Sequence, residues 1–179
     1  MYWDKKGQEC TEDTVSVAIQ AAKEKGIKVV VVASNTGATA ELFAGKGLEV
    51  VCVTHVNGFV NPGENEMSIE NRSKLEALNI KVLTTTHVLS GAERAFSSKF
   101  GGIYPVEIIA NTLRIFGQGV KVGVEIATMA LDSGLIPFGE SIIAVGGTGR
   151  GADSAIIMKP AHSKDILNTR IEEIICKPR

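Results

Sequence analysis

A run of small and hydroxyl-bearing residues separates an apolar stretch from a helix-forming stretch: Ser34, Asn35, Thr36, Gly37, Ala38 and Thr39. The first turn of a helix has main-chain N–H groups without partners and a partial positive charge, so it holds anions well. Glycine lets the main chain approach a ligand closely, and hydroxyl groups add donors without a lysine. The pattern predicts a phosphate site, and the alternative is that Ser34 or Thr36 only caps the helix.

A second glycine-rich run follows another apolar stretch and consists of Gly146, Gly147, Thr148, Gly149 and Arg150. The guanidinium of Arg150 can bind a phosphate or a carboxylate through two parallel hydrogen bonds. The alternative is a plain connection between strands, in which Asp153 stabilises the turn. We expect this run to contact the same ligand.

Two threonines and two histidines stand at the ends of expected strands: Thr54, His55, Thr86 and His87. Open parallel sheets bind ligands in the crevice outside the carboxyl ends of their strands, so these four residues belong to the expected binding site. The histidines either set the polarity of the crevice or carry protons, and no carboxylate stands beside them at HExxH-type spacing. The sequence predicts no metal site and identifies no catalytic residue.

Charge and motif content argue against several classes of function. Lys and Arg total 19 and Asp and Glu total 20, so no basic field exists to attract nucleic acid. No apolar run reaches membrane length and the first ten residues are polar, which favours a cytoplasmic protein without a membrane partner. Cys52 and Cys176 lie in apolar runs and are expected to be buried thiols. A Walker motif is absent, and the glycines after the first strand do not fit a Rossmann fingerprint.

Hydrophobic periodicity predicts a single α/β domain over residues 1–179. The expected strands cover residues 27–33, 48–53, 80–83, 141–145, 154–158 and 171–176, the last at an edge of the sheet. The expected helices cover residues 11–25, 39–44, 68–77, 106–116 and 120–131, with exposed loops at 57–66 and 97–104. The early strands are expected to be parallel, whereas 141–145 and 154–158 are too close for a crossover helix and should pair antiparallel.

Two further features lie in the helical second half of the chain. Glu125 is an acidic residue in an apolar helical stretch; we interpret it as facing solvent, with a buried carboxylate as the alternative. Phe100, Ile103 and Tyr104 form an apolar group that indicates a homo-oligomer, with packing into the core as the alternative.

Several segments together resemble the C-terminal α/β domain of pyruvate kinase, and still more closely a family of stand-alone proteins with that fold. They are the strand and loop from Val29 to Ala40, the strand from Val50 to Thr54, and the tail segments Gly147–Asp153, Lys159–His162 and Ile174–Cys176. The resemblance extends from about Thr11 to Arg179. It implies a three-layer α/β/α fold with a mostly parallel sheet of order 3-2-1-4-5, in which the fifth strand is antiparallel.

This resemblance also carries functional expectations. Strands one and four are neighbours in the implied order, so the two glycine-rich runs should face one crevice. Stand-alone members carry flavin mononucleotide (FMN) without an assigned reaction, which implies FMN as the cofactor. Pyruvate kinase catalysis takes place in a barrel that has no counterpart here. Ala38 replaces the basic residue usual in pyruvate kinase loops, which argues against regulation by a sugar bisphosphate.

Three functional hypotheses therefore follow from the sequence. The first is a protein that binds a phosphorylated small ligand, most simply FMN. The second is an enzyme acting on a phosphorylated metabolite with His55 or His87 as proton carrier. The third is a regulatory module that senses a phosphorylated metabolite and acts through a partner chain.

Overall fold

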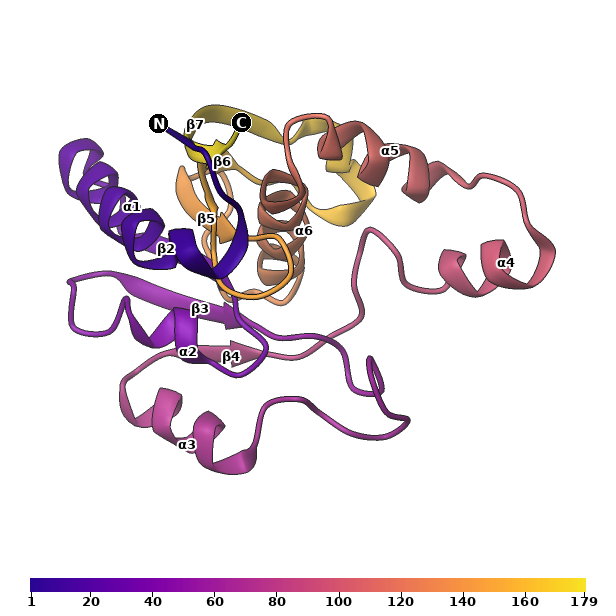
Figure 1. Cartoon of the computed structure of the whole chain (residues 1–179), viewed down its shortest axis with the longest axis horizontal. Coiled ribbons are helices and arrows are strands. Elements are labelled where there is room, and N and C mark those ends of the chain that lie inside the picture. Colours follow the sequence, from indigo (N-terminus) through magenta and orange to yellow (C-terminus); the bar gives the residue numbers. More distant parts are fainter.

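Seven strands form one sheet in the order β1-β7-β6-β5-β2-β3-β4, and helices cover both of its faces (Figure 1). This computed structural model describes residues 1–179. The strands are β1 (Tyr2–Trp3), β2 (Val29–Ala33), β3 (Glu49–Val53), β4 (Lys81–Leu83), β5 (Ile142–Gly146), β6 (Ser154–Lys159) and β7 (Arg170–Pro178). The helices are α1 (Thr11–Lys25), α2 (Ala38–Glu41), α3 (Ile69–Ala77), α4 (Glu93–Phe100), α5 (Pro105–Arg114) and α6 (Gln118–Asp132). Two 3₁₀ turns complete the chain, η1 (Gly7–Cys10) and η2 (Ser163–Asn168).

The order β4-β3-β2-β5-β6 confirms the 3-2-1-4-5 sheet expected from the sequence. β2 pairs in parallel with β3 and with β5, and β5 pairs antiparallel with β6, as the short connection between them requires. The expectation that the last strand lies at the edge was wrong. β1 pairs in parallel with β7, so that Tyr2 and Trp3 lie beside Lys177 and Pro178 and form the outer strand at this edge.

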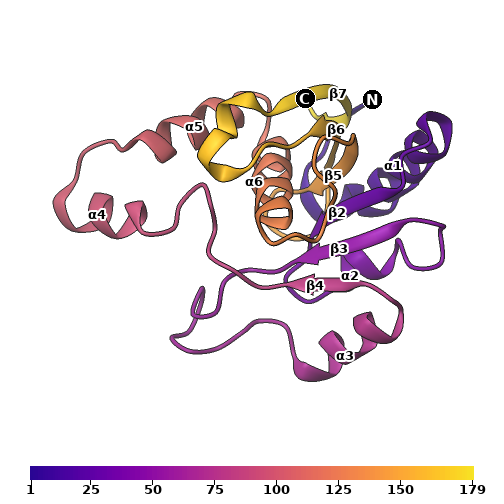
Figure 2. The same cartoon turned by 180° about the vertical axis from the view of Figure 1, so that it is seen from behind.

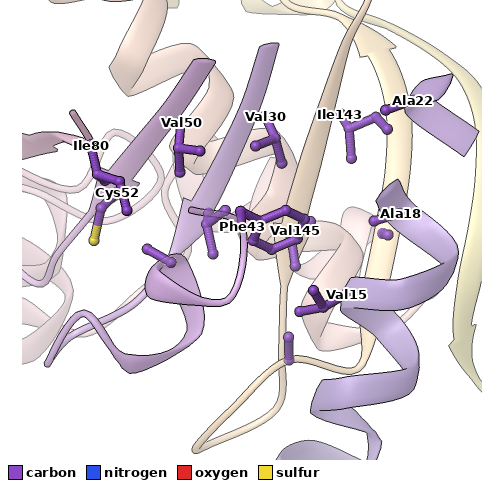
Figure 3. Close-up of a cluster of buried hydrophobic side chains, with 14 of the residues drawn as sticks. Val15, Ala18, Ala22, Val30, Phe43, Val50, Cys52, Ile80, Ile143 and Val145 are labelled. Atoms are coloured by element: carbon purple, nitrogen blue, oxygen red, sulfur yellow. The ribbon is translucent and has the colours of Figure 1, made fainter. Parts of the chain in front are cut away.

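The central strands are apolar throughout because both of their faces are covered. Side chains at alternating positions of β2 enter different cores: Val30 and Val32 face α1 and α2, whereas Val29 and Val31 face α6. Figure 3 shows Val30 and its neighbours in β3 and β5 pointing to the side of the sheet where α1 packs. Every one of these four valines is at most 5% exposed. The two cores fix the positions at which the strands end.

The two views of the whole chain show how the helices are distributed over the sheet. α1, α2 and α3 cover one face, and α6 covers the other with α5 packed beside it (Figures 1 and 2). Ser68 caps the start of α3, and its Oγ accepts a hydrogen bond of 3.1 Å from the amide of Asn71. None of the helices combines the length and apolar composition that crossing a bilayer requires.

The expectation of a loop over residues 97–104 was also wrong for its first half, because α4 occupies residues 93–100. The segment has no helix-breaking residue before Gly101, where φ is +71° and the helix ends. Ser97, one of the serines that suggested a loop, instead joins α4 to α5. Ser97 donates a hydrogen bond of 2.7 Å to the carboxylate of Glu107 in α5.

Candidate functional site

The candidate site lies where β2, β3, β4 and β5 reach their carboxyl ends. β2 and β5 are direct neighbours, and their register pairs Val32 with Val145. Ser34 and Gly147 therefore leave adjacent strands at the same edge of the sheet. The structure thus brings together the two glycine-rich runs that the sequence placed 112 residues apart.

The loop after β2 leaves most of its main-chain N–H groups without protein partners. The amide of Ser34 bonds to the carbonyl of Val53, and the amide of Thr39 bonds to Oγ of Ser34 at 3.2 Å. The capping role considered for Ser34 is therefore confirmed for one amide. The amides of residues 35–38 donate no hydrogen bond within the chain. Four consecutive N–H groups at a strand end form a cradle suited to an anion.

Gly37 is the residue that this loop geometry requires. Its φ of +93° lies in the left-handed region, and a Cβ atom there would lie 2.7 Å from Cδ1 of Leu75. Any side chain would therefore strain the backbone and push against α3. Glycine keeps the cradle both open and close to α3.

A small hollow of about 100 Å³ adjoins the loop. Asn71 in α3 donates a hydrogen bond of 3.1 Å to the carbonyl of Thr36 and so ties α3 to the loop. Nζ of Lys74 lies 2.6 Å from the carboxylate of Glu41 and provides a cation beside the loop. The hollow is lined by Thr36, Gly37, Ala38, Glu41, Asn71, Lys74 and Leu75. Sequence reasoning missed Asn71 and Lys74, because only the packing of α3 on the sheet brings them here.

The loop after β5 is held from behind by a buried carboxylate. Oδ2 of Asp153 accepts hydrogen bonds from the amides of Thr148 at 3.1 Å and of Gly7 at 2.8 Å. Oδ1 accepts a third from Ser154 Oγ at 2.8 Å. The interpretation of Asp153 as a turn-stabilising residue is confirmed. Arg150 is exposed and has no counter-ion in the chain, so its guanidinium is available to a ligand.

Three rings gather beyond the ends of β3 and β4. The ring centroid of His55 lies 3.8 Å from that of Phe59 and 5.5 Å from that of His87. Nδ1 of His55 also lies 2.5 Å from the carboxylate of Glu66. Phe59 and Glu66 belong to the loop expected at residues 57–66, whose glycine, proline and asparagine content gave no sign of their partners. The cluster combines aromatic faces with a carboxylate-oriented imidazole.

The two threonines near this cluster differ in their surroundings. Thr54 is buried, and its Oγ1 lies 2.7 Å from Oγ1 of Thr84 at the end of β4. Arg72 in α3 donates to the same Thr84 oxygen at 2.9 Å. Thr86 is exposed and makes no side-chain hydrogen bond within the chain. The structure therefore gives Thr54 a role in joining β3 to β4 and leaves Thr86 at the surface.

Burial lowers the pKa of His87 below its ordinary value of 6.5. The positive charges of His55, Lys121 and Arg94 act in the same direction, and the charge of Glu125 opposes them. The imidazole of His87 is therefore neutral at physiological pH, with one nitrogen available as an acceptor.

Glu125 is 5% exposed, so the interpretation that it faces solvent was wrong. Its carboxylate forms an ion pair with Lys121, one turn earlier in α6, and also accepts a hydrogen bond of 3.0 Å from the amide of Leu89. The pair is buried because the segment after β4 crosses this part of α6. The i,i+4 spacing of Lys121 and Glu125 in an apolar helix was the only signal in the sequence.

A hollow of about 390 Å³, larger than the one beside the loop after β2, lies elsewhere on the surface. It is lined by five residues of α1 and by Lys46, just before β3, and so lies toward the amino ends of the strands. It has one apolar lining residue and no group from the glycine-rich loops. Position at the strand ends, rather than size, identifies the candidate site.

Comparison with known proteins gives the chain its family. The α/β domain of pyruvate kinase matches residues 12–158. A solved pyruvate kinase of Cryptosporidium parvum is similar at 16% identity and a TM-score of 0.44, over 83% of this chain and 22% of that one. The same organism's pyruvate kinase in complex with ADP is similar at 18% identity and a TM-score of 0.41, over 82% and 22%.

The chain thus spans less than a quarter of the length of the solved proteins that it resembles. The family match covers all strands of the crevice, from β2 to Met158 in β6, together with the loops after β2 and β5. On that match, this chain belongs to the pyruvate kinase α/β domain family.

Proposed function

We propose that the chain binds a phosphorylated small molecule at the carboxyl ends of β2 and β5, with FMN as the favoured ligand. The observation that carries the proposal is the row of amides at residues 35–38, which donate no hydrogen bond within the chain. Hydrogen-bond donors of this kind satisfy phosphate oxygens, and the hydroxyl of Thr36 adds one more. Lys74 in α3, which pairs with Glu41 at 2.6 Å, lines the same hollow and adds a donor beside the loop.

The remaining residues of the crevice suit the rest of a flavin nucleotide. The rings of His55, Phe59 and His87 offer faces for a planar conjugated ring. The run from Gly146 to Arg150 presents main-chain groups and one guanidinium to a polyhydroxyl chain. A bound flavin would supply reversible uptake of one or two electrons, and the protein would supply orientation and local polarity.

Titration of FMN fluorescence tests this proposal directly. Quenching at micromolar concentration of the purified protein is expected, with riboflavin bound at least about tenfold more weakly because it lacks the phosphate. Inorganic phosphate should compete with FMN. Unchanged FMN fluorescence at about 50 µM protein would contradict flavin binding, and equal affinity for riboflavin would contradict the role of the loop after β2.

A second candidate function is an enzyme that moves a proton on a phosphorylated metabolite. It is favoured by the 2.5 Å contact between His55 and Glu66, because a carboxylate on Nδ1 orients an imidazole and strengthens Nε2 as a base. Phosphorylated metabolites incubated in D₂O should then exchange a carbon-bound proton, detected by NMR. Exchange lost in His55→Gln supports this function, and absence of exchange with the unaltered protein contradicts it.

A further inference from the structure

Residues 93–116, called the arm below, extend away from the sheet. The arm comprises α4, α5 and their short connections; α5 packs beside α6, and both views show α4 projecting from the body of the molecule (Figures 1 and 2). α4 buries no side chain, and α5 buries only Ala110. An eight-residue helix is not stable by itself in water, so α4 depends on contacts outside the helix.

Polar groups fasten the two helices of the arm to each other. The carboxylate of Glu93 accepts a hydrogen bond of 2.9 Å from the amide of Val106. The carboxylate of Glu107 accepts one from Ser97 Oγ. Acidic side chains are thus used inside the arm, and large apolar ones are left outside. In a helix pair surrounded only by water, the apolar side chains face the other helix and the charged ones face solvent. The arm has the opposite arrangement.

The exposed apolar side chains of the arm are continuous. The ring of Phe96 lies 6.1 Å from that of Phe100 and 6.3 Å from that of Tyr104. Ile108 and Ile115 follow Tyr104 at spacings that place them on the same side of α5. These five residues form one line, called the arm seam below, that runs over both helices.

The size of this surface is close to what a stable interface needs. With roughly 150–200 Å² for each fully exposed side chain, six large residues of the arm present roughly 600–750 Å² of apolar surface, and the four of them that belong to the arm seam present roughly 400–500 Å². A standard interface covers about 800 Å² per partner, and a monomer's largest apolar patch is usually about 300–600 Å². The six residues and their exposure are Phe96 (52%), Phe100 (67%), Ile103 (80%), Ile108 (55%), Ile115 (80%) and Phe116 (49%).

We propose that the arm is the contact surface of a homodimer, in which the arm seams of two copies pack against each other around a two-fold axis. The five side chains of the arm seam carry no charge, and Nζ of Lys99 lies 5.5 Å from the centroid of the Phe100 ring at the α4 end. Most of the partner surface must therefore be apolar. The arm of a second copy provides such a surface, and a two-fold contact sets apolar residues against apolar residues. The formal net charge of −1 offers little repulsion between copies.

Sedimentation equilibrium of the full chain tests the dimer. At about 50 µM the unaltered protein should have twice the chain mass and should dissociate on dilution. The double variant Ile108→Glu/Ile115→Glu should be monomeric at the same concentration, with affinity between copies reduced at least about 100-fold. The matched control Ile69→Glu/Leu167→Glu changes two residues that are both 85% exposed but lie outside the arm, and it should stay dimeric.

Hydrogen exchange provides a measurement that needs no substitution. Amides of residues 93–116 should be protected at about 50 µM and lose that protection at about 0.5 µM, whereas the strands should not change. A sedimentation mass equal to that of one chain at the higher concentration overturns the proposal. A dimer that persists in the arm variant, or protection that is independent of dilution, overturns it as well.

Discussion

The main-chain amide of Gly7 lies 2.8 Å from Oδ2 of Asp153, a carboxylate that is fully buried. This bond joins the start of the chain to the loop after β5, on which one side of the candidate site depends. The two segments pack so closely here that a Cβ atom added at Gly7 would lie 2.8 Å from the carbonyl oxygen of Thr148. The N-terminal segment is thus part of the support of the site, although it lines none of it.

Asp153→Ala should destabilise the protein by about 2–4 kcal/mol, because it leaves the buried amide of Gly7 and the half-buried amide of Thr148 without acceptors. Urea denaturation followed by circular dichroism measures this change. Asp165→Ala removes a carboxylate that is half exposed and should stay within about 0.5 kcal/mol of the unaltered protein. Equal stability of the two variants would contradict the structural role of Asp153.

Lys121→Met should cost about 3–5 kcal/mol, because it leaves the charge of Glu125 buried without its cation. The double variant Lys121→Met/Glu125→Gln should recover most of this loss, since the Gln oxygen can still accept from the amide of Leu89. A double-mutant cycle in urea measures the coupling. Lys5→Met in the exposed pair with Glu9, which has the same spacing, should change stability little. Additive effects at Lys121 and Glu125 would contradict this prediction.

The lowered pKa of His87 predicts a specific dependence of stability on pH. Below about pH 6.5 the unfolded chain takes up a proton at this residue while the folded chain resists it, so stability falls on acidification until the folded pKa is reached. His87→Gln should reduce the slope of the urea midpoint between about pH 5 and pH 7. Identical slopes for His87→Gln and the unaltered protein would show that burial does not affect this imidazole.

Gly37→Ala should weaken FMN binding at least about tenfold, because the φ of +93° and the contact with Leu75 force the loop after β2 to move. Gly45→Ala is a matched control, since Gly45 also has a positive φ and a Cβ atom added there would meet no other atom within 4 Å. FMN fluorescence titration of both variants measures the difference. Loss of binding in Gly45→Ala alone would place the ligand elsewhere.

The sheet could be predicted from the sequence because its information is local. Runs such as Val29–Ala33 show by composition that both faces are covered, and the short connection between β5 and β6 permits only an antiparallel pair. The resemblance to pyruvate kinase then supplied the strand order. That order was sufficient to place Ser34 and Gly147 at one edge.

The residues that support the site could not be predicted in the same way, because each acts on a partner far away in the chain. Lys74 reaches the loop after β2 only through the packing of α3, and Asp153 finds its donor at Gly7. Glu125 was misassigned because its burial depends on the segment around Leu89 rather than on α6 itself. α4 was missed because the partner of the Ser97 hydroxyl, Glu107, lies in the next helix and cannot be identified from the composition of the segment.

The pairing of β1 with β7 makes the polypeptide almost a closed ring. Both ends of the chain lie in neighbouring strands at one edge of the sheet, where the amide of Lys177 bonds to the carbonyl of Met1 and that of Arg179 to the carbonyl of Trp3 (Figure 1). A short glycine linker between the two ends would preserve every strand pairing. New ends opened between Gly101 and Gly102, at the tip of the projecting helices, would give a circularly permuted chain with the same crevice.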